Sequence, residues 1–205
     1  MKYYIITPAK NEEQYIRLTL ESMVKQTVKP EKWIIVNDGS TDRTLEIAEE
    51  YAAKHPWIQI ISLDNKGEQR SYGSKVIRAF NAGYRLITDN DYGFIVKLDA
   101  DLSFPETYFQ QIGEAFDADP KLGLCGGYVL ERPDEYEIKK TRFPRVEGAL
   151  KSVRKACFDD IGGFVEENGW DGLDILMALH KGWEMRNIDV KVTHHRPETS
   201  AYRST

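Results

Sequence analysis

Strand-like and helix-like segments alternate through the first hundred residues of this chain, and that alternation strongly limits the folds open to it. Apolar runs typical of buried strands occupy 2–7, 32–36, 58–63 and 94–98. Between them, apolar residues at helical spacing predict helices over 12–25, 42–55 and 71–88. Strands joined through helices of this length pair in parallel by right-handed crossovers. We therefore expect an α/β fold with a Rossmann-like, mostly parallel sheet and helices on both faces.

The pattern loosens after residue 101. Helices are predicted over 104–116, 152–161 and 171–182, strands over 122–130 and 185–192, and a charged loop over 133–144. No repeat or low-complexity linker separates this half from the first. The second half therefore reads as an extension of the same sheet, and we expect a single domain over 1–205.

Composition excludes several protein classes. Apolar content of 41% and charged content of 30% are typical of a soluble globular protein. The first apolar run is too short for a signal peptide or a membrane span. Cys125 and Cys157 lie in apolar surroundings and read as reduced core residues. We expect a cytoplasmic protein.

The net charge of −5 hides a basic segment. Between residues 139 and 155 there are seven basic residues and one acid, Glu147, so this segment carries +6 and the remainder −11. One interpretation is a solvated loop and helix face. The other is a surface for an anionic partner: a nucleotide diphosphate, a lipid phosphate or a membrane. Nucleic acid is not expected as a partner, because the overall balance is acidic and no nucleic-acid motif accompanies the segment.

Asp99-Ala100-Asp101 directly follows the apolar run 94–98. In an extended chain both carboxylates lie on one face, roughly 7 Å apart. Two charges at that distance repel by about 2–3 kcal/mol at an effective dielectric constant near 20, and a divalent cation removes the repulsion. Similar Asp-x-Asp patterns at 89–91 and 117–119 lie in a polar turn and at a helix exit. Only the copy at 99–101 lies where open α/β sheets bind ligands, which predicts a site for a metal and its phosphates.

Two further polar turns follow predicted strands, at 8–13 and 37–42. Asp38, at the end of the second strand, can accept hydrogen bonds from a ribose hydroxyl or a base edge. Alone, each turn reads better as an ordinary strand-to-helix connection, in which Asn11 caps a helix and Glu12 suits its positive end.

Taken in order, the segments 8–13, 37–42 and 99–101 resemble the family 2 glycosyltransferases. Further matches are Asn65-Lys66-Gly67, Asn81-Ala82-Gly83, Gly162-Gly163-Phe164 and 169–174. The resemblance extends from residue 2 to about 195. It implies the A-type nucleotide-sugar-binding fold, with a nucleotide-binding half (about 1–101), an acceptor-side half (about 102–195) and a polar tail (196–205).

The resemblance implies an inverting, metal-dependent glycosyltransferase that moves a sugar from a nucleotide-diphosphate sugar to an acceptor hydroxyl, in cell-surface polysaccharide or glycolipid synthesis. Asp99 would lie against the ribose and metal-bound water, and Asp101 would ligate Mg²⁺ or Mn²⁺ at the diphosphate. The other residues that it places at the nucleotide are Pro8, Glu12, Asp38, Lys66, Gly67 and Arg70.

Inversion requires a carboxylate that takes the proton of the acceptor hydroxyl as its oxygen attacks. The family usually carries Glu-Asp at this place, whereas this chain has Trp170-Asp171-Gly172-Leu173-Asp174. We assign Asp171 as the base, with Asp174 as the alternative. Both residues also fit the N-terminal cap of the helix that follows.

In the resembling enzymes a histidine near the last strand often supplies a further metal ligand. His194 and His195 follow the strand-like run 189–192. Strand alternation turns His194 inward and His195 outward. We therefore assign His194 to the metal, with His195 as the alternative and an ordinary surface pair as the competing interpretation.

Two other functions stay open. A sugar-1-phosphate nucleotidyltransferase is disfavoured, because the first strand lacks the glycine-rich basic loop that cradles a triphosphate. A noncatalytic nucleotide-sugar binder would keep Asp38 and Asp101 but lack a working base. The expected acceptor is a saccharide or a polyprenyl-phosphate-linked sugar, which the basic segment 139–155 would meet at the anionic inner face of a membrane.

Overall fold

The computed structural model describes residues 1–65, 74–130 and 145–196. The strands are β1 (Tyr3–Ala9), β2 (Lys32–Asn37), β3 (Ile58–Ser62), β4 (Phe94–Leu98), β5 (Leu102–Ser103), β6 (Leu122–Leu130), β7 (Leu150–Arg154) and β8 (Glu184–His194). The helices are α1 (Ile16–Val24), α2 (Thr44–Ala52), α3 (Ser74–Tyr84), α4 (Tyr108–Ala118), α5 (Lys155–Asp160) and α6 (Trp170–His180).

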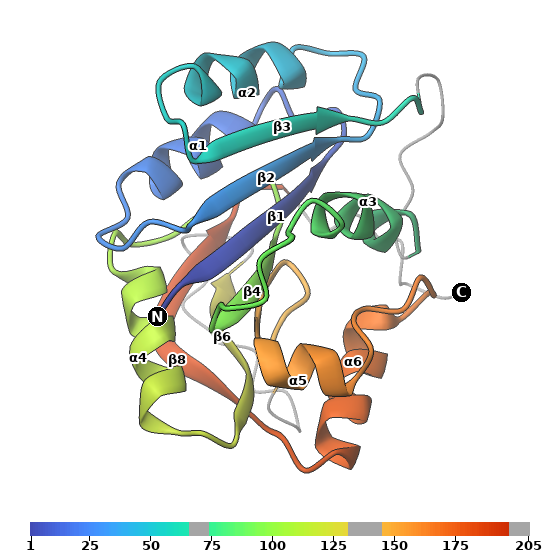
Figure 1. Ribbon diagram of the computed structural model, residues 1–205. Coiled ribbons are helices and arrows are strands. Elements are labelled where there is room, and N and C mark those ends of the chain that lie inside the picture. Colours follow the sequence, from blue (N-terminus) through green and yellow to red (C-terminus); the bar gives the residue numbers. More distant parts are fainter. Residues whose placement is uncertain (66–73, 131–144, 197–205) are drawn as a thin grey trace.

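Within the described residues these strands form a single eight-stranded sheet in the order β3-β2-β1-β4-β7-β6-β8-β5 (Figure 1). β1 pairs in parallel with both β2 and β4, and β3 pairs in parallel with β2. The chain thus moves outward from β1 to β3 and then returns to the other side of β1 as β4. Open α/β sheets bind ligands at such a reversal of strand order, outside the carboxyl ends of the strands.

The second half of the sheet is mixed. β7 lies antiparallel between β4 and β6, and β5 pairs antiparallel with β8. β6 and β8 are parallel, so four of the strand pairings in the described part of the chain are parallel and three are antiparallel. The predicted α/β sheet is confirmed; the first half is parallel throughout, and the second half contains both kinds of pairing.

Several predicted helices begin later than expected, and two of these differences have a clear local cause. The helix predicted from 152 is a strand as far as Arg154, and only Lys155–Asp160 is helical. The polar residues Lys151 and Ser152 concealed this strand, because both are buried in it. The helix predicted from 12 begins at Ile16, since Asn11 has a positive φ of 55° and the next residues form a turn.

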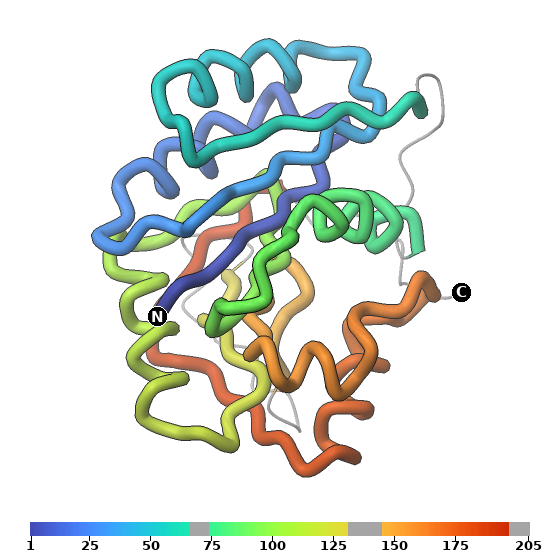
Figure 2. Tube along the Cα trace, in the orientation of Figure 1, coloured from blue at the N-terminus to red at the C-terminus, as the bar shows by residue number. Residues whose placement is uncertain are grey.

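Helices cover both faces of the sheet, as predicted (Figure 2). Side chains alternate along β1, so Tyr3 and Ile5 pack into a core with α1, α2 and α4. Tyr4 and Ile6 face the opposite way and pack with α3, α5 and α6. Because both faces are buried, the central strands are apolar almost throughout.

Helix α3 approaches the sheet closely at Gly83. A Cβ at this position would lie 2.9 Å from Cγ2 of both Ile6 and Val36. A side chain therefore does not fit here without displacing β1, β2 or the helix. This contact gives a packing reason for the glycine of Asn81-Ala82-Gly83.

Cys125 and Cys157 are free and buried, as predicted. Neither thiol is near a disulfide partner, so both behave as small core residues. Among the helices that are described, none combines the length and the apolar character needed to cross a membrane.

Candidate active site

A cleft that is partly open to solvent lies at the carboxyl ends of the parallel strands. It is lined by Pro8, Ala9, Lys10, Glu12, Asp38, Val76, Ala79, Asp99 and Ala100. Four residues predicted to bind the nucleotide therefore meet in one place: Pro8, Glu12, Asp38 and Asp99. Lys66, Gly67 and Arg70 lie outside the described residues.

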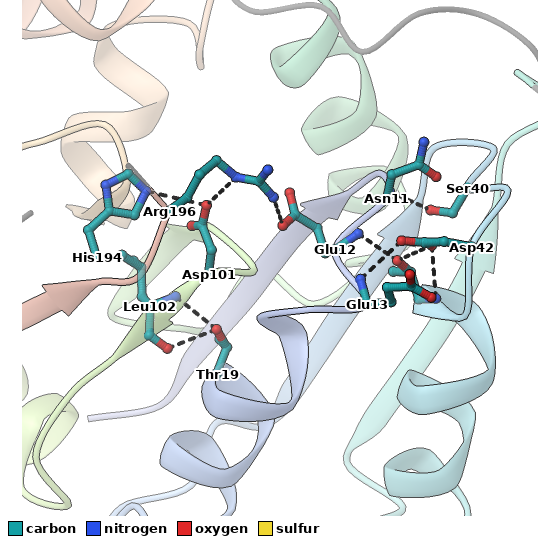
Figure 3. A network of polar contacts seen from close by, with 11 residues as sticks. Asn11, Glu12, Glu13, Thr19, Ser40, Asp42, Asp101, Leu102, His194 and Arg196 are labelled. Carbon is teal, nitrogen blue, oxygen red and sulfur yellow. Dashed lines mark hydrogen bonds and ion pairs between the residues drawn. The ribbon is translucent and has the colours of Figure 1, made fainter. Parts of the chain in front are cut away.

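The loops that follow β1 and β2 are tied together by hydrogen bonds (Figure 3). Asn11 accepts a bond from the backbone N–H of Thr41 at 2.9 Å, and the backbone N–H of Glu12 donates to Thr44 Oγ1 at 2.6 Å. The left-handed backbone at Asn11, which asparagine tolerates better than most residues, turns the chain toward the second loop. These bonds fix the backbone from which the Glu12 side chain reaches the cleft.

Asp38 is held from two directions. Its backbone N–H donates to the carbonyl of Ala9 at 2.8 Å, which joins the ends of β1 and β2. Its carboxylate accepts a hydrogen bond from Asn65 Nδ2, and Lys10 Nζ donates to the Asn65 carbonyl at 3.2 Å. The sequence motif at 65–67 thus begins beside the carboxylate that was predicted to bind the nucleoside.

Asp99 and Asp101 have different partners, and the negative charge of Asp101 acts on the Asp99 carboxyl. β4 ends at Leu98, and Ala100 and Asp101 already lie in a turn. The Asp99 carboxylate pairs with Lys97, whereas Asp101 Oδ2 lies 3.3 Å from His194 Nε2 and 3.0 Å from Arg196 Nε. Asp99 faces the cleft and Asp101 lies buried beside it.

The two carboxylates differ in their affinity for a proton. Burial raises the pKa of Asp99, although the Lys97 ammonium opposes the rise. Burial also acts to raise the pKa of Asp101, but hydrogen bonds and charge from His194 and Arg196 outweigh it and lower that pKa to about 2. Asp101 is therefore an anion at neutral pH.

The residues at Asp101 fit a divalent cation. Its Oδ1 atom is buried and has no hydrogen-bond partner among the described residues. A carboxylate oxygen beside an imidazole nitrogen suits Mn²⁺ or Mg²⁺. In the described part of the chain no three acidic, histidine or cysteine side chains converge on one point. Among the described residues, Asp101 and His194 are therefore the side chains placed to hold such a cation.

The neighbouring His195 has different contacts from His194. Its backbone N–H donates to the carbonyl of Asp101 at 2.9 Å, and its Nε2 lies 2.8 Å from Ser103 Oγ. These contacts hold the turn after β4 against the end of β8. Of the two histidine side chains, the structure brings His194 to the Asp101 carboxylate.

Asp171 and Asp174 differ sharply in environment. The Asp174 side chain is 1% exposed, and Lys151 Nζ contacts its two oxygens at 2.7 and 2.9 Å. Asp171 is 23% exposed and forms an ion pair with Arg145. Neither caps α6: the N-cap residue is Gly169, and no side-chain cap bond is present. Of these two carboxylates, Asp171 is the one that reaches solvent.

The first turn of α6 is anchored to β7 and β4. Lys151 Nζ donates to the backbone carbonyl of Asp171 at 2.9 Å and lies 5.1 Å from the ring centroid of Trp170. Lys97, the partner of Asp99, lies 5.4 Å from the same ring. The buried Trp170 therefore connects the strand that leads to Asp99 with the helix that carries Asp171.

The basic segment makes little free positive surface where it is described. Lys151 is buried, Arg145 pairs with Asp171, and Lys155 pairs with Asp159. Arg154 donates to the backbone carbonyls of Phe116, Asp119 and Leu122. The remaining basic residues, Lys139, Lys140 and Arg142, lie outside the described residues.

Comparison with known proteins decides the family. Residues 4–168, more than half of the chain, match the family model described as glycosyl transferase family 2. The chain belongs to this family. The match includes the cleft residues and Asp101, and it ends before Asp171 and His194.

Several bacterial relatives in the family resemble part of this chain. It is 43% identical to the putative glycosyltransferase EpsH of Bacillus subtilis over 132 residues, which are 63% of this chain and 34% of EpsH. It is 32% identical to glycosyltransferase GlyA of Streptococcus pneumoniae over 60% of this chain and 16% of GlyA. This family 2 chain thus spans about a third or less of the length of these relatives.

Solved structures show the same A-type glycosyltransferase fold. The mannosyltransferase PcManGT of Pyrobaculum calidifontis, in complex with GDP-Man and Mn²⁺, superimposes with a TM-score of 0.74 at 22% identity, over 96% of this chain and 57% of that one. TarS of S. aureus (1–349), in complex with UDP-GlcNAc, gives a TM-score of 0.74 at 20% identity, over 100% of this chain and 62% of that one. The fold predicted from the family resemblance is confirmed.

Sequence reasoning missed three basic residues at this family 2 site: Lys97, Lys151 and Arg196. Lys97 had a detectable signal, because a lysine inside an otherwise apolar strand needs a buried acidic partner. Arg196 was assigned to the polar tail, although it directly follows the two histidines. Lys151 gave no such signal, since its partner Asp174 lies on another element.

Proposed function

We propose that this chain transfers a sugar from a nucleotide-diphosphate sugar to an acceptor hydroxyl. The observation that carries the proposal is the cleft at the reversal of strand order, where Asp38 and Asp99 meet beside the Asp101–His194 pair. Family membership and the nucleotide sugars bound to the structural neighbours support it.

The donor would bind along the cleft. Asp38, held by Asn65, accepts hydrogen bonds from the nucleoside, and Asp99 lies on the same wall as Glu12. Both carboxylates are acceptor groups, which suits the hydroxyls of a ribose. We assign Pro8 to the same wall as an apolar contact.

Asp101 and His194 would hold Mg²⁺ or Mn²⁺. The unpartnered Asp101 Oδ1 and the nearby imidazole nitrogen are the ligands that the chain itself provides. When bound, the cation stabilises negative charge on the leaving diphosphate as a Lewis acid. His194 must be neutral to act as a ligand, so its Nε2 carries no proton in that state.

Asp171 would act as the base. Its carboxylate takes the proton of the acceptor hydroxyl as the oxygen attacks the anomeric carbon opposite the leaving group, and the configuration at that carbon inverts. The Arg145 ion pair and the bond from Lys151 to the Asp171 backbone orient the carboxylate before the acceptor arrives. Asp174, fully engaged with Lys151, plays no direct part.

A saccharide or a polyprenyl-phosphate-linked sugar remains the proposed acceptor, in cell-surface polysaccharide or glycolipid synthesis at the cytoplasmic face of a membrane. The described basic residues of 145–155 bind internal partners. Peripheral contact with anionic lipid would therefore depend on Lys139, Lys140 and Arg142.

A binding screen followed by a turnover assay tests the function. UDP, GDP, TDP and CDP sugars, each with Mn²⁺, are added to the protein while its thermal midpoint is measured, because a ligand of the native state raises that midpoint. We expect one nucleotide class to raise it and Asp38→Asn to reduce the effect. Failure of every nucleotide sugar to bind would overturn the proposal. Binding without transfer to water or any acceptor would leave a noncatalytic binder.

A further inference from the structure

Arg196 joins two buried carboxylates from distant parts of the chain (Figure 3). Its Nε donates to Asp101 Oδ2 at 3.0 Å, and a terminal nitrogen pairs with Glu12 Oε2. Its guanidinium also lies 5.1 Å from the ring centroid of Tyr15. The side chains of Glu12 and Asp101 are 3 and 4% exposed, so each needs a nearby cation to offset its burial.

Asp101 is also the carboxylate to which a metal ion would bind. Asp101 Oδ2 already meets both Arg196 and His194, and only Oδ1 lacks a partner. A divalent cation bound to Asp101 and His194 would share the single negative charge of the Asp101 carboxylate with the guanidinium. Two cations in that arrangement repel, and the buried surroundings screen the repulsion weakly.

The Arg196 guanidinium lies next to a second place where it could bind an anion, the proposed donor cleft. The Arg196 side chain is 22% exposed, and its partner Glu12 lines the cleft. Arg196 thus lies at the border of the proposed donor site. A planar guanidinium binds phosphate oxygens through paired hydrogen bonds as readily as it binds carboxylates.

We propose that Arg196 alternates between two partners. In the empty protein it serves as the cation of the metal site and neutralises Asp101 and Glu12. When the divalent cation binds, the guanidinium leaves Asp101 and binds phosphate oxygens of the nucleotide diphosphate. This inference rests on the proposed function and adds to it a residue that exchanges one anion for another as the donor binds.

If Arg196 exchanges partners, its substitution should raise the affinity for Mn²⁺ and lower the affinity for the nucleotide. Arg196→Gln removes the competing cation, so Mn²⁺ alone should bind about tenfold tighter than to the wild type. At saturating Mn²⁺ that competition no longer matters, and the lost phosphate contact should weaken UDP or GDP binding by about tenfold. Mn²⁺ binding is measured by electron paramagnetic resonance of the free ion, and nucleotide binding by calorimetry.

Two further variants distinguish the charge of the Arg196 side chain from its planar shape, and both from a nonspecific effect of losing a surface arginine. Arg196→Lys keeps the charge and loses the planar fork, so Mn²⁺ affinity should stay near the wild-type value while nucleotide affinity falls. Arg17→Gln is the matched control, because Arg17 also pairs with a glutamate, at 3.0 Å, and lies 5.7 Å from the centroid of a tyrosine ring. It should change neither affinity.

Loss of Arg196 leaves Glu12 without this cation and could unfold the protein. A second comparison avoids this problem: Glu12→Gln is compared with Glu12→Gln/Arg196→Gln, so that neither protein carries the Glu12 charge. The double variant should bind Mn²⁺ tighter than the single one. Weaker or unchanged Mn²⁺ binding on loss of Arg196 overturns the exchange, because it makes Arg196 a support for Asp101. Unchanged nucleotide affinity at saturating Mn²⁺ overturns it as well. A wild type that binds neither Mn²⁺ nor any nucleotide overturns the proposed function itself.

Discussion

Lys97 and Lys151 lie opposite each other on β4 and β7, and both ammonium groups lie over the ring of Trp170. Each lysine has its own carboxylate, Asp99 for Lys97 and Asp174 for Lys151. Burial lowers the pKa of Lys151 and raises the pKa of Asp174, while the ion pair between them opposes both shifts. The arrangement couples the wall of the cleft to the helix that carries Asp171.

Removal of Lys151 should be strongly destabilising. Lys151→Met leaves Asp174 buried without its cation, and we expect the free energy of unfolding to fall by about 3–5 kcal/mol in urea titrations. The double variant Lys151→Met/Asp174→Leu removes both charges and should recover to within about 1 kcal/mol of the wild type. A single variant as stable as the wild type would show that Asp174 is satisfied in another way.

Asp171→Asn should reduce turnover without changing the affinity for the donor nucleotide. Loss of a general base slows the chemical step by about a thousandfold, whereas the residues that we assign to the nucleotide line a cleft to which Asp171 does not contribute. Rates and nucleotide affinities are measured on the same preparation. Asp159→Asn, which removes an exposed carboxylate paired with Lys155, is the control and should leave both quantities unchanged. Full turnover by a folded Asp171→Asn protein would remove Asp171 from the mechanism.

His194→Ala and His195→Ala should have different effects on the metal. His194 lies 3.3 Å from Asp101 Oδ2, so its loss should weaken Mn²⁺ binding by about tenfold to a hundredfold. The His195 ring contacts Ser103 at 2.8 Å, and its loss should lower the thermal midpoint with little change in Mn²⁺ affinity. The reverse pattern would assign the ligand to His195.

Both cysteines should resist alkylation in the native protein. Burial raises the pKa of Cys125 and of Cys157 to about 12, so each thiol stays protonated at pH 8, and the thiolate is the reactive form. We expect slow reaction with a thiol reagent at pH 8 and rapid reaction of both groups in concentrated urea. Fast labelling of either cysteine without denaturant would mean that its part of the core opens readily.

Two glycine substitutions should act in opposite directions. At Gly83 a new Cβ would lie 2.9 Å from Ile6 and Val36, and we expect Gly83→Ala to cost about 1–3 kcal/mol of stability. At Gly113 in α4 no atom lies within 4 Å of the Cβ position. Gly113→Ala should therefore add about 0.5–1 kcal/mol through the higher helix propensity of alanine. Equal effects at the two sites would contradict the close packing of α3.

The sequence predicted the parallel half of the fold because its strands are short apolar runs separated by amphipathic helices. It failed at β7, where Lys151 and Ser152 gave a buried strand a polar composition. β5 has two residues, which is too few for any periodic signal.

Glu12, Asp38 and Asp99 in the cleft were predictable because they occupy loops that follow strands. The partners of these residues were not. Arg196 meets Asp101 and Glu12 across 95 and 184 residues of chain, and no local pattern encodes such a contact. The pairing of Lys151 with Asp174 likewise depends on how α6 packs against β7. These contacts follow from tertiary packing alone.

The pairing of β5 with β8 sets when the proposed metal site can form during synthesis. Leu102, next to Asp101, pairs with His194 across these strands. A nascent chain can assemble β1 to β4 and the walls of the cleft while β8 is still inside the ribosome. It cannot bring the His194 imidazole to Asp101 until β8 has emerged and joined the sheet, so the proposed site for a cation forms later than the cleft beside it.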